Sequence, residues 1–206
     1  MLEPSKINKL NNFIAGWYID NKICDDLITY FKNSPNKKPG VLETMEVKNN
    51  FKKSTDLAIL PFNTDEIIKK YVIELHKVLK EYKKKYSFCD EGQPQWGITE
   101  GFNIQKYEPQ EGFLKYHTER SSLKTSLRHL VFMTYLNNVE DKGQTEFYYQ
   151  KLNVKPEKGL TLIWSADWTF THKGIASPTQ TKYITTGWFS YISKGGNIKW
   201  KKQKLK

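Results

Sequence analysis

The texture of the chain changes near residue 96, and this change constrains the fold more than any other feature of the sequence. From there on, short segments rich in β-branched and aromatic residues alternate with turn residues, and no amphipathic segment of helix length interrupts them. The candidate strands cover residues 98–107, 114–119, 128–136, 145–149, 160–164, 169–172 and 182–192. Such a series predicts two packed β-sheets, as in a sandwich or a jelly roll.

The part of the chain before residue 96 predicts helices that pack on one face of these sheets. Residues 20–33 carry apolar side chains at helical spacing, and Asp20 can cap the start of that helix. A second amphipathic helix is expected from residue 63 or 64, with a lysine-rich last turn that suits the negative end of the helix dipole. Between the two, residues 33–55 have no clear period and predict a loop that covers a binding site.

Length and composition predict a single domain. The 206 residues contain no Pro/Gly/Ser-rich linker, so we expect a helical support and loop at 1–95, a jelly-roll core at 96–192 and a basic tail at 193–206. Residues 1–12 do not resemble a secretory signal, no apolar run is long enough to cross a membrane, and Cys24 and Cys89 form no disulfide framework. These features predict a cytoplasmic protein without a membrane partner.

The charge of the chain suggests acidic partners at first sight. Its formal net charge is +11, yet only Arg120 and Arg128 among the 33 basic residues are arginines, the side chain that best contacts phosphates and guanine edges. A lysine-rich solvated surface therefore explains the charge better than a nucleic-acid interface does. Nucleic acid stays open as a partner.

The four histidines separate into two groups. His76 lies within the second expected helix and His129 lies in a strand without a neighbouring acid, so neither is expected to take part in chemistry. His117 and Glu119 are two positions apart, which places both side chains on one face of the expected strand at 114–119. With His172 as a third ligand, this set matches non-haem Fe(II) sites; a catalytic zinc site and a mere surface pair are the alternatives.

Lys182 helps to choose among these alternatives. It lies ten positions after His172 and opens a strand whose alternate residues share its face. If that face lines the cavity that holds His172, the buried ammonium requires an anion. 2-Oxoglutarate could chelate the metal with one end and reach the ammonium with the other, whereas a hydrolytic zinc enzyme has no use for this lysine. The candidate walls of the cavity are tryptophans: Trp164, Trp168 and Trp188.

Around these residues the chain resembles the Fe(II)/2-oxoglutarate-dependent dioxygenases, and within them the prolyl-4-hydroxylase-like group of microbes and their viruses. The matching stretches are 102–107, 117–119, 128–139, 143–147, 154–159, 172–174 and 181–188. The resemblance implies a mainly β fold, a double-stranded β-helix (jelly roll, cupin-like) buttressed by N-terminal α-helices. Two positions depart from the family pattern: Glu119 stands where most relatives have Asp, and Gln144 replaces the second glycine of a Gly-Gly-Glu-Thr turn.

The resemblance also implies the roles of the site residues. His117, Glu119 and His172 would hold Fe(II), and Lys182 and Tyr107 would hold the distal carboxylate of 2-oxoglutarate. Ascorbate is a further expected cofactor. The residues 96–192 would then form the catalytic core of a single oxygenase domain.

The implied reaction is the hydroxylation of a C–H bond, with 2-oxoglutarate decarboxylated to succinate and CO₂. A prolyl residue in a peptide or protein is the expected substrate. The alternatives for the same chemistry are a free amino acid, another small molecule or a nucleic acid, because a fold alone does not fix a substrate. The alternative from a different class is a non-catalytic basic binding module. The sequence leaves the oligomeric state open.

Overall fold

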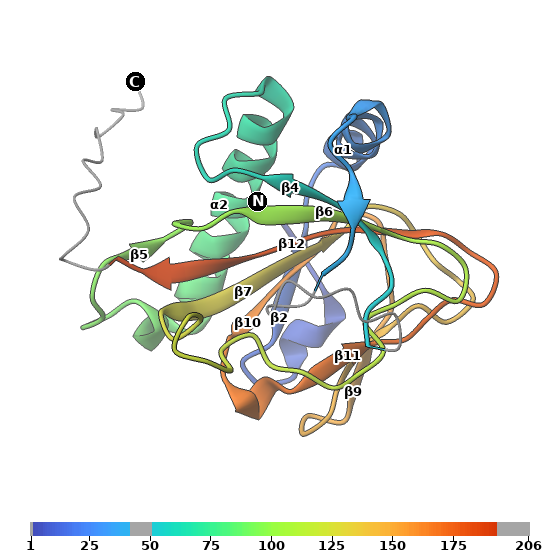
Figure 1. Ribbon diagram of the computed structural model, residues 1–206. Coiled ribbons are helices and arrows are strands. Elements are labelled where there is room, and N and C mark those ends of the chain that lie inside the picture. The colour runs from blue at the N-terminus through green and yellow to red at the C-terminus, as the bar shows by residue number, and fades with distance from the viewer. Residues whose placement is uncertain (1, 42–50, 193–206) are drawn as a thin grey trace.

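The computed structural model describes residues 2–41 and 51–192, and it has the mainly β architecture that the sequence predicts (Figure 1). Within these ranges the helices are α1 (Asn21–Asn33), α2 (Glu66–Lys85) and the short 3-10 helices η1 (Lys6–Lys9), η2 (Ser87–Cys89) and η3 (Trp168–Phe170). The strands are β1 (Glu3–Pro4), β2 (Ala15–Tyr18), β3 (Lys38–Pro39), β4 (Thr55–Ile59), β5 (Trp96–Gly97), β6 (Phe102–Tyr107), β7 (Arg128–Tyr135), β8 (Thr145–Phe147), β9 (Leu152–Val154), β10 (Leu160–Ser165), β11 (His172–Gly174) and β12 (Lys182–Tyr191). The expected basic tail at 193–206 and the middle of the expected loop at 33–55 lie outside the described residues.

Two antiparallel sheets form the jelly roll. The large sheet has the strand order β1-β2-β10-β7-β12-β6-β4-β3, with β5 paired to β12, and the small sheet has the order β11-β8-β9. β12 lies at the centre of the large sheet, between β7 and β6, and its register places Lys182 opposite Tyr107. The two sheets and the helices confirm the double-stranded β-helix buttressed by α-helices.

Buried apolar side chains pack against both faces of the large sheet. On one face they join it to the helices, through residues such as Leu27, Tyr71 and Phe132. On the other face they join it to the small sheet, through residues such as Phe147 and Trp164. Figure 1 shows the same layers, with α1 and α2 on one side of the large sheet and β9 and β11 on the other. The space between the two sheets is therefore the natural place for a site.

Both expected α-helices are present. The carboxylate of Asp20 accepts a hydrogen bond from the backbone N–H of Lys22 at 2.8 Å, which confirms the expected cap of α1. α2 begins at Glu66, slightly later than expected, because Asn63 accepts a hydrogen bond from the backbone of Asp65 in the turn before the helix. No helix in the described ranges is long and apolar enough to cross a membrane.

Two of the expected strands are wrong. In segment 114–119 the backbone N–H groups of Leu114 and His117, and that of Arg120 just beyond, bond to three different segments, so the bonds recur every third residue instead of every second. His117 also bonds its own side chain to the carbonyl of Lys115, a local contact that competes with a strand ladder. The segment forms only an isolated bridge between His117 and His172. Residues 169–172 are likewise irregular, since η3 occupies the first two of them and β11 begins only at His172.

The sequence analysis also misses β2 and β4, which extend the large sheet on opposite sides of its centre. β2 has only four residues and is buried on both faces, so it lacks the alternation that marks a half-exposed strand. β4 carries Asp56 on a face that lines the cavity described below. Both strands therefore lack the sequence pattern of an ordinary surface strand.

Candidate active site

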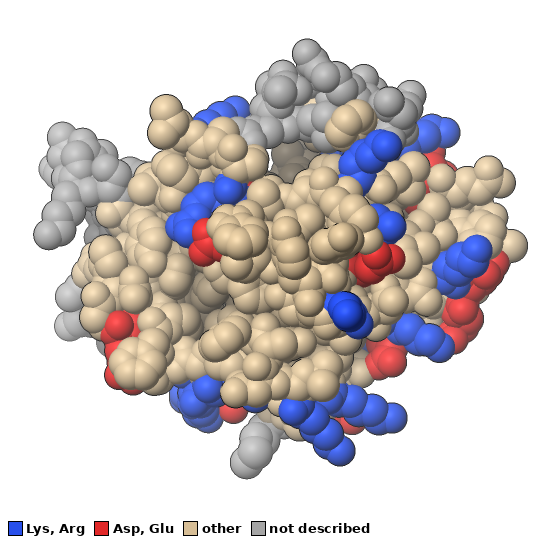
Figure 2. Space-filling view, turned by 90° about the horizontal axis from the view of Figure 1, so that it is seen from below, with Lys and Arg blue, Asp and Glu red and all other residues tan. Residues whose placement is uncertain are grey.

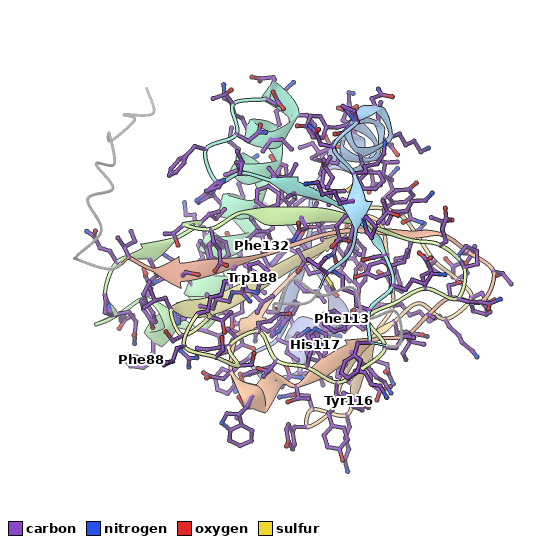
Figure 3. All side chains as sticks on the ribbon, viewed as in Figure 1. Phe88, Phe113, Tyr116, His117, Phe132 and Trp188 are labelled. Atoms are coloured by element: carbon purple, nitrogen blue, oxygen red, sulfur yellow. The ribbon has the colours of Figure 1, made fainter. Side chains whose placement is uncertain are left out.

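A cavity of about 840 Å³ lies between the two sheets. Side chains from both sheets and from the irregular segment around residue 117 line it, and among them are all five predicted site residues: Tyr107, His117, Glu119, His172 and Lys182. Figure 3 shows His117, Phe113 and Trp188 in the region between the large sheet and β11. The fold thus brings the predicted residues together in one place.

His117, Glu119 and His172 form a compact group of possible metal ligands. One ligand atom from each lies within 4.8 Å of the others. The Nε2 atom of His117 is 3.5 Å from Oε1 of Glu119, and that of His172 is 3.4 Å from the same oxygen. Reciprocal backbone hydrogen bonds of 2.9 and 3.0 Å between His117 and His172 hold the two imidazoles side by side.

The second ring nitrogen of each histidine fixes the tautomer. Nδ1 of His117 is 3.0 Å from the carbonyl oxygen of Lys115, and Nδ1 of His172 is 2.9 Å from that of Phe170. A carbonyl oxygen only accepts, so Nδ1 carries the proton in both rings and Nε2 presents a lone pair to the carboxylate. Three acceptor atoms that converge in this way fit a cation.

The charges of the three groups agree with this interpretation. Burial and the neighbouring His172 lower the pKa of His117, so its imidazole is neutral at pH 7. Burial opposes the ionisation of Glu119, but the hydrogen bond that it accepts from the indole N–H of Trp188 favours the charged form. The site therefore combines two imidazoles with a charged carboxylate, the donor set of 2-His-1-carboxylate metal sites.

Trp188 and Arg128 hold Glu119 in place. The indole N–H of Trp188 donates a hydrogen bond of 2.9 Å to Oε2 of Glu119. The guanidinium of Arg128 lies 3.4 Å from the centroid of the Trp188 ring and also donates to the backbone carbonyl of Glu119 at 3.0 Å. Glu100 anchors the guanidinium in turn through an ion pair of 2.9 Å. These contacts orient the longer glutamate arm that stands in place of the family's aspartate.

Phe113 is a further neighbour of the metal group that sequence reasoning does not find. Its ring stacks on His117 with centroids 3.5 Å apart and an angle of 8° between the planes. Neither Phe113 nor the partners of Glu119 has a local sequence signal, since each contact depends on how distant segments meet. His76 is exposed and His129 bonds to the carbonyl of Cys89, so both lie outside the group, as the sequence predicts.

Lys182 is a buried cation in the wall of the same cavity. Its ammonium donates to the carbonyl oxygen of Gly143 at 2.8 Å, and the ring centroid of Tyr107 lies 5.2 Å away. No carboxylate of the described residues forms an ion pair with it, and burial lowers the pKa of Lys182 to about 8. The ammonium is still charged at pH 7, so an anion entering the cavity would gain a partner that the protein does not supply.

Tyr107 lies opposite Lys182, but its hydroxyl is already engaged. It donates a hydrogen bond of 2.8 Å to Oε1 of Gln105, whose Nε2 donates to Asp56 at 3.0 Å. Asp56 also pairs with Lys52 at 2.6 Å. Because a carboxylate only accepts, Asp56 fixes the orientation of the Gln105 amide and thereby the direction of the Tyr107 proton. Burial raises the pKa of Tyr107 well above its usual value, so the hydroxyl stays protonated.

The expected tryptophan walls are confirmed in part. Trp164 and Trp188 line the cavity. Trp168, in η3, does not line it and is 63% exposed. Trp168 is exposed because η3 buries a different aromatic residue: Phe170 is the member of this short helix that packs into the core.

Comparisons with known proteins agree with the geometry. Residues 102–190 match the model of the 2OG-Fe(II) oxygenase superfamily. No curated protein sequence matches the chain. Solved structures do match it, at low sequence identity.

Three of these structures are prolyl hydroxylases. A prolyl-4-hydroxylase of Pseudomonas putida has a TM-score of 0.68 at 16% identity, with 87% of this chain and 94% of that chain covered. The viral collagen prolyl hydroxylase of Paramecium bursaria Chlorella virus 1, in a 2OG complex, has a TM-score of 0.64 at 18% identity, with 88% and 98% covered. A Trichoplax adhaerens prolyl hydroxylase, bound to a peptide fragment of the hypoxia inducible factor oxygen degradation domain, has a TM-score of 0.69 at 15% identity, with 89% and 86% covered. Residues 102–190 are therefore similar to the 2OG-Fe(II) oxygenase superfamily, the 2-oxoglutarate-dependent dioxygenases, and the chain has the jelly-roll fold of these three prolyl hydroxylases.

Proposed function

We propose that this protein is an Fe(II)- and 2-oxoglutarate-dependent hydroxylase that acts on a prolyl residue of a peptide or protein. His117, Glu119 and His172 would hold Fe(II), and Lys182 would pair with the distal carboxylate of 2-oxoglutarate. When bound, the metal and 2-oxoglutarate supply the oxidising chemistry that converts a C–H bond to an alcohol, with O₂ consumed and succinate and CO₂ released.

The observation that carries the proposal is the place of Lys182. A buried ammonium without a carboxylate partner lines the same cavity as three converging acceptors. A zinc hydrolase needs the acceptors but not the ammonium, and a binding module without turnover needs neither. A dicarboxylate between the two groups satisfies both, because one end can bind the metal and the other can pair with the lysine.

The remaining side chains have supporting roles. Trp188 and Arg128 orient Glu119, and the carbonyls of Lys115 and Phe170 orient the imidazoles. Tyr107 faces the ammonium as a protonated phenol. Because its proton is directed at Gln105, it would reach the distal carboxylate only if it gives up that bond. We therefore expect Lys182 to contribute more than Tyr107 to 2-oxoglutarate binding.

The substrate assignment is supported by the size of the cavity and by the fold neighbours. A cavity of about 840 Å³ leaves room beside a molecule as small as 2-oxoglutarate. Each of the fold neighbours described above is a prolyl hydroxylase, and one of them binds a peptide. If the substrate is instead a free amino acid, another small molecule or a nucleic acid, that compound would drive succinate release in the turnover assay described below. Ascorbate as a cofactor and a cytoplasmic location stay predictions.

Anaerobic titration with Fe(II) and 2-oxoglutarate tests the cofactor assignment. We expect a weak visible charge-transfer band in the wild type and its loss in the His117→Ala and His172→Ala variants. Lys182→Ala should keep metal binding but weaken 2-oxoglutarate binding by at least about 100-fold, since it removes a buried charge partner. The exposed Lys80, on the outer side of α2, provides a matched Lys80→Ala control that should behave as the wild type.

Succinate release with proline-containing peptides then tests the substrate. Succinate formed in step with hydroxyproline would support the prolyl assignment. A normal charge-transfer band with no peptide-dependent turnover would remove the prolyl assignment and leave the cofactor assignment intact. Absence of the band in the wild type would overturn both.

A further inference from the structure

The wall of the cavity contains a second buried lysine, Lys52, which has no part in the function proposed above. Lys52 lies just before β4, lines the cavity and pairs with Asp56 at 2.6 Å. On the face seen in Figure 2, lysines, arginines and acidic side chains are open to solvent. The side chains of Lys52 and Asp56, in contrast, are only 7% and 12% exposed, which makes them the most buried lysine–carboxylate pair of the described residues. Because the burial of two charges costs about as much as their attraction returns, stability alone does not explain the pair.

Backbone contacts hold Lys52 against the segment that leads to His117. Two hydrogen bonds of 2.9 and 2.7 Å join residues 51–53 to residues 112–114, and an isolated bridge pairs Lys52 with Phe113. The ammonium of Lys52 lies 5.9 Å from the ring centroid of Phe113, at the outer limit of a cation–π contact. Figure 3 shows Phe113 next to His117, on whose imidazole it stacks. Lys52 therefore contacts the aromatic ring that covers one of the candidate metal ligands.

Asp56 connects Lys52 to the other end of the cavity. Its Oδ1 atom accepts a hydrogen bond of 2.8 Å from the hydroxyl of Ser54. Its Oδ2 atom accepts from the ammonium of Lys52 at 2.6 Å and from Nε2 of Gln105 at 3.0 Å. Gln105 in turn accepts from the hydroxyl of Tyr107 at 2.8 Å. A chain of hydrogen bonds thus leads from Lys52 to the tyrosine at the 2-oxoglutarate end of the candidate site.

The charge of Asp56 opposes the binding of an anion in the same cavity. Asp56 and Glu119 are the two carboxylates among the described residues that line it, and Glu119 belongs to the metal group. Asp56 on β4 and Lys182 on β12 are separated by β6, so the strand spacing places them roughly 10–12 Å apart. Two charges still interact over this distance at the effective dielectric constant of a protein. Without Lys52, Asp56 would therefore repel a dicarboxylate held by Lys182.

We propose that Lys52 is a positioning residue for 2-oxoglutarate, because it neutralises Asp56 and so lets the cavity accept a dicarboxylate; this rests on the proposed function. Through the same carboxylate it fixes Gln105 and the direction of the Tyr107 hydroxyl. Lys52 acts through these side chains and needs no contact with 2-oxoglutarate. The two buried lysines of the cavity thus have different tasks, since Lys182 would pair with the ligand whereas Lys52 pairs with the protein.

Anaerobic calorimetry with the Fe(II)-loaded protein tests the proposal, because removing either half of the ion pair has its own expected effect on the Kd of 2-oxoglutarate. Lys52→Met leaves Asp56 unpaired and should raise this Kd by about tenfold, the effect of one charge on another at the distance given above. Asp56→Asn leaves only the cation and should keep the Kd at or below the wild-type value. The double variant Lys52→Met/Asp56→Asn has no unpaired charge, so its Kd should return to within about threefold of the wild-type value.

A ligand without the distal carboxylate gives a second readout. 2-Oxopentanoate keeps the metal-chelating end of 2-oxoglutarate but lacks its second charge, so Lys52→Met should weaken its binding much less. Lys53→Met is the matched control. Lys53 is the next lysine along the chain, its side chain is 56% exposed, and it pairs with Glu111 at 3.3 Å, so its removal should leave the Kd of both ligands unchanged.

The outcomes separate this proposal from the proposed function. Equal affinity of wild type and Lys52→Met for 2-oxoglutarate would overturn the role of Lys52. Equal weakening of both ligands, without recovery in the double variant, would assign Lys52 to general packing and also overturn it. If Lys52→Met does not fold, weaker 2-oxoglutarate binding by Asp56→Asn has the same meaning. A wild type that does not bind 2-oxoglutarate would overturn both proposals, whereas the expected Kd pattern without prolyl turnover would remove the substrate assignment alone.

Discussion

Lys182 is a buried cation in the cavity wall, and we expect its protonation to set how well the cavity holds an anion. Burial alone lowers its pKa to about 8. The groups that face it are the carbonyl of Gly143 and the protonated phenol of Tyr107, and no carboxylate of the described ranges pairs with it. The ligand-free lysine therefore loses its proton as the pH rises through about 8.

We expect the Kd of 2-oxoglutarate to depend on this proton. It should change little between pH 6 and 7 and rise by about tenfold per pH unit well above 8, because binding must then take up a proton. Anaerobic calorimetry with the metal-loaded protein measures the effect. Lys182→Arg is the control, since a guanidinium stays charged and the Kd should then be nearly independent of pH. The same rise in that variant would contradict the assignment.

Trp188 would act on a bound metal through Glu119, to which its indole N–H donates. Trp188→Phe keeps a ring beneath Arg128 but removes the N–H that donates to Oε2 of Glu119. We expect Fe(II) affinity to fall by about 10- to 100-fold, the usual effect of losing an outer-shell partner, with 2-oxoglutarate still bound by Lys182. Trp96→Phe is the matched control, because the buried indole N–H of Trp96 has no hydrogen-bond partner among the described residues. Equal loss in both variants would indicate general destabilisation.

At the scale of the elements, β12 organises the site. It presents Lys182 and Trp188 on its cavity face and pairs with β6 and β7. Its other face lies on the helix side of the large sheet. Gly187 allows the closest approach there, because a Cβ at this position would lie against Cβ of Phe102 and 2.5 Å from Cζ of Phe132.

Gly187→Ala therefore forces β12 out of position. We expect a loss of about 1–3 kcal/mol in the free energy of unfolding, as in other overpacked cores, and weaker metal and 2-oxoglutarate binding as β12 shifts. Thermal unfolding and the anaerobic titration measure the two effects. Gly97→Ala on β5 is the control, since a Cβ there meets no atom within 4 Å. A normal melting temperature for Gly187→Ala would show that the packing is looser than described.

The elements also show what the sequence can predict. The spacing of His117 and Glu119 correctly predicts that their side chains converge. The expected strand is wrong, however, because an irregular segment with one isolated bridge brings the two side chains together. Asp20 as a helix cap and Lys182 at the start of a strand follow from local patterns, and both are confirmed. The roles of Trp188 and Phe113 depend on contacts between distant segments, so no local pattern reveals them.

At the scale of the whole molecule, the site joins parts of the chain that are far apart in sequence. The candidate metal ligands lie on the irregular segment and on β11, while Lys182 lies on β12. Ligands that bind only this assembled form stabilise the fold by mass action. The net charge of +11, in contrast, explains nothing about the cavity.

We expect metal and 2-oxoglutarate together, each at about 100 times its Kd, to raise the free energy of unfolding by about 5 kcal/mol. For a chain of this size that corresponds to an increase in Tm of about 10–20 °C. Anaerobic thermal scans measure it. Lys182→Ala should lose the share due to 2-oxoglutarate and keep the share due to metal. An unchanged Tm of the wild type at saturation would contradict ligand binding to the folded state.

The pairing of Lys182 with Tyr107 has a consequence for folding accuracy. Side chains on a strand alternate between faces, so a slip of β12 by one residue would exchange Lys182 with Tyr183 and put the ammonium on the helix side. Such a misregistered molecule would retain nearly the same hydrogen-bond ladder and the same circular dichroism, but it would have no pocket for a dicarboxylate. Retention on a 2-oxoglutarate affinity resin would therefore separate molecules with the correct register of β12 from molecules in which β12 is shifted by one residue.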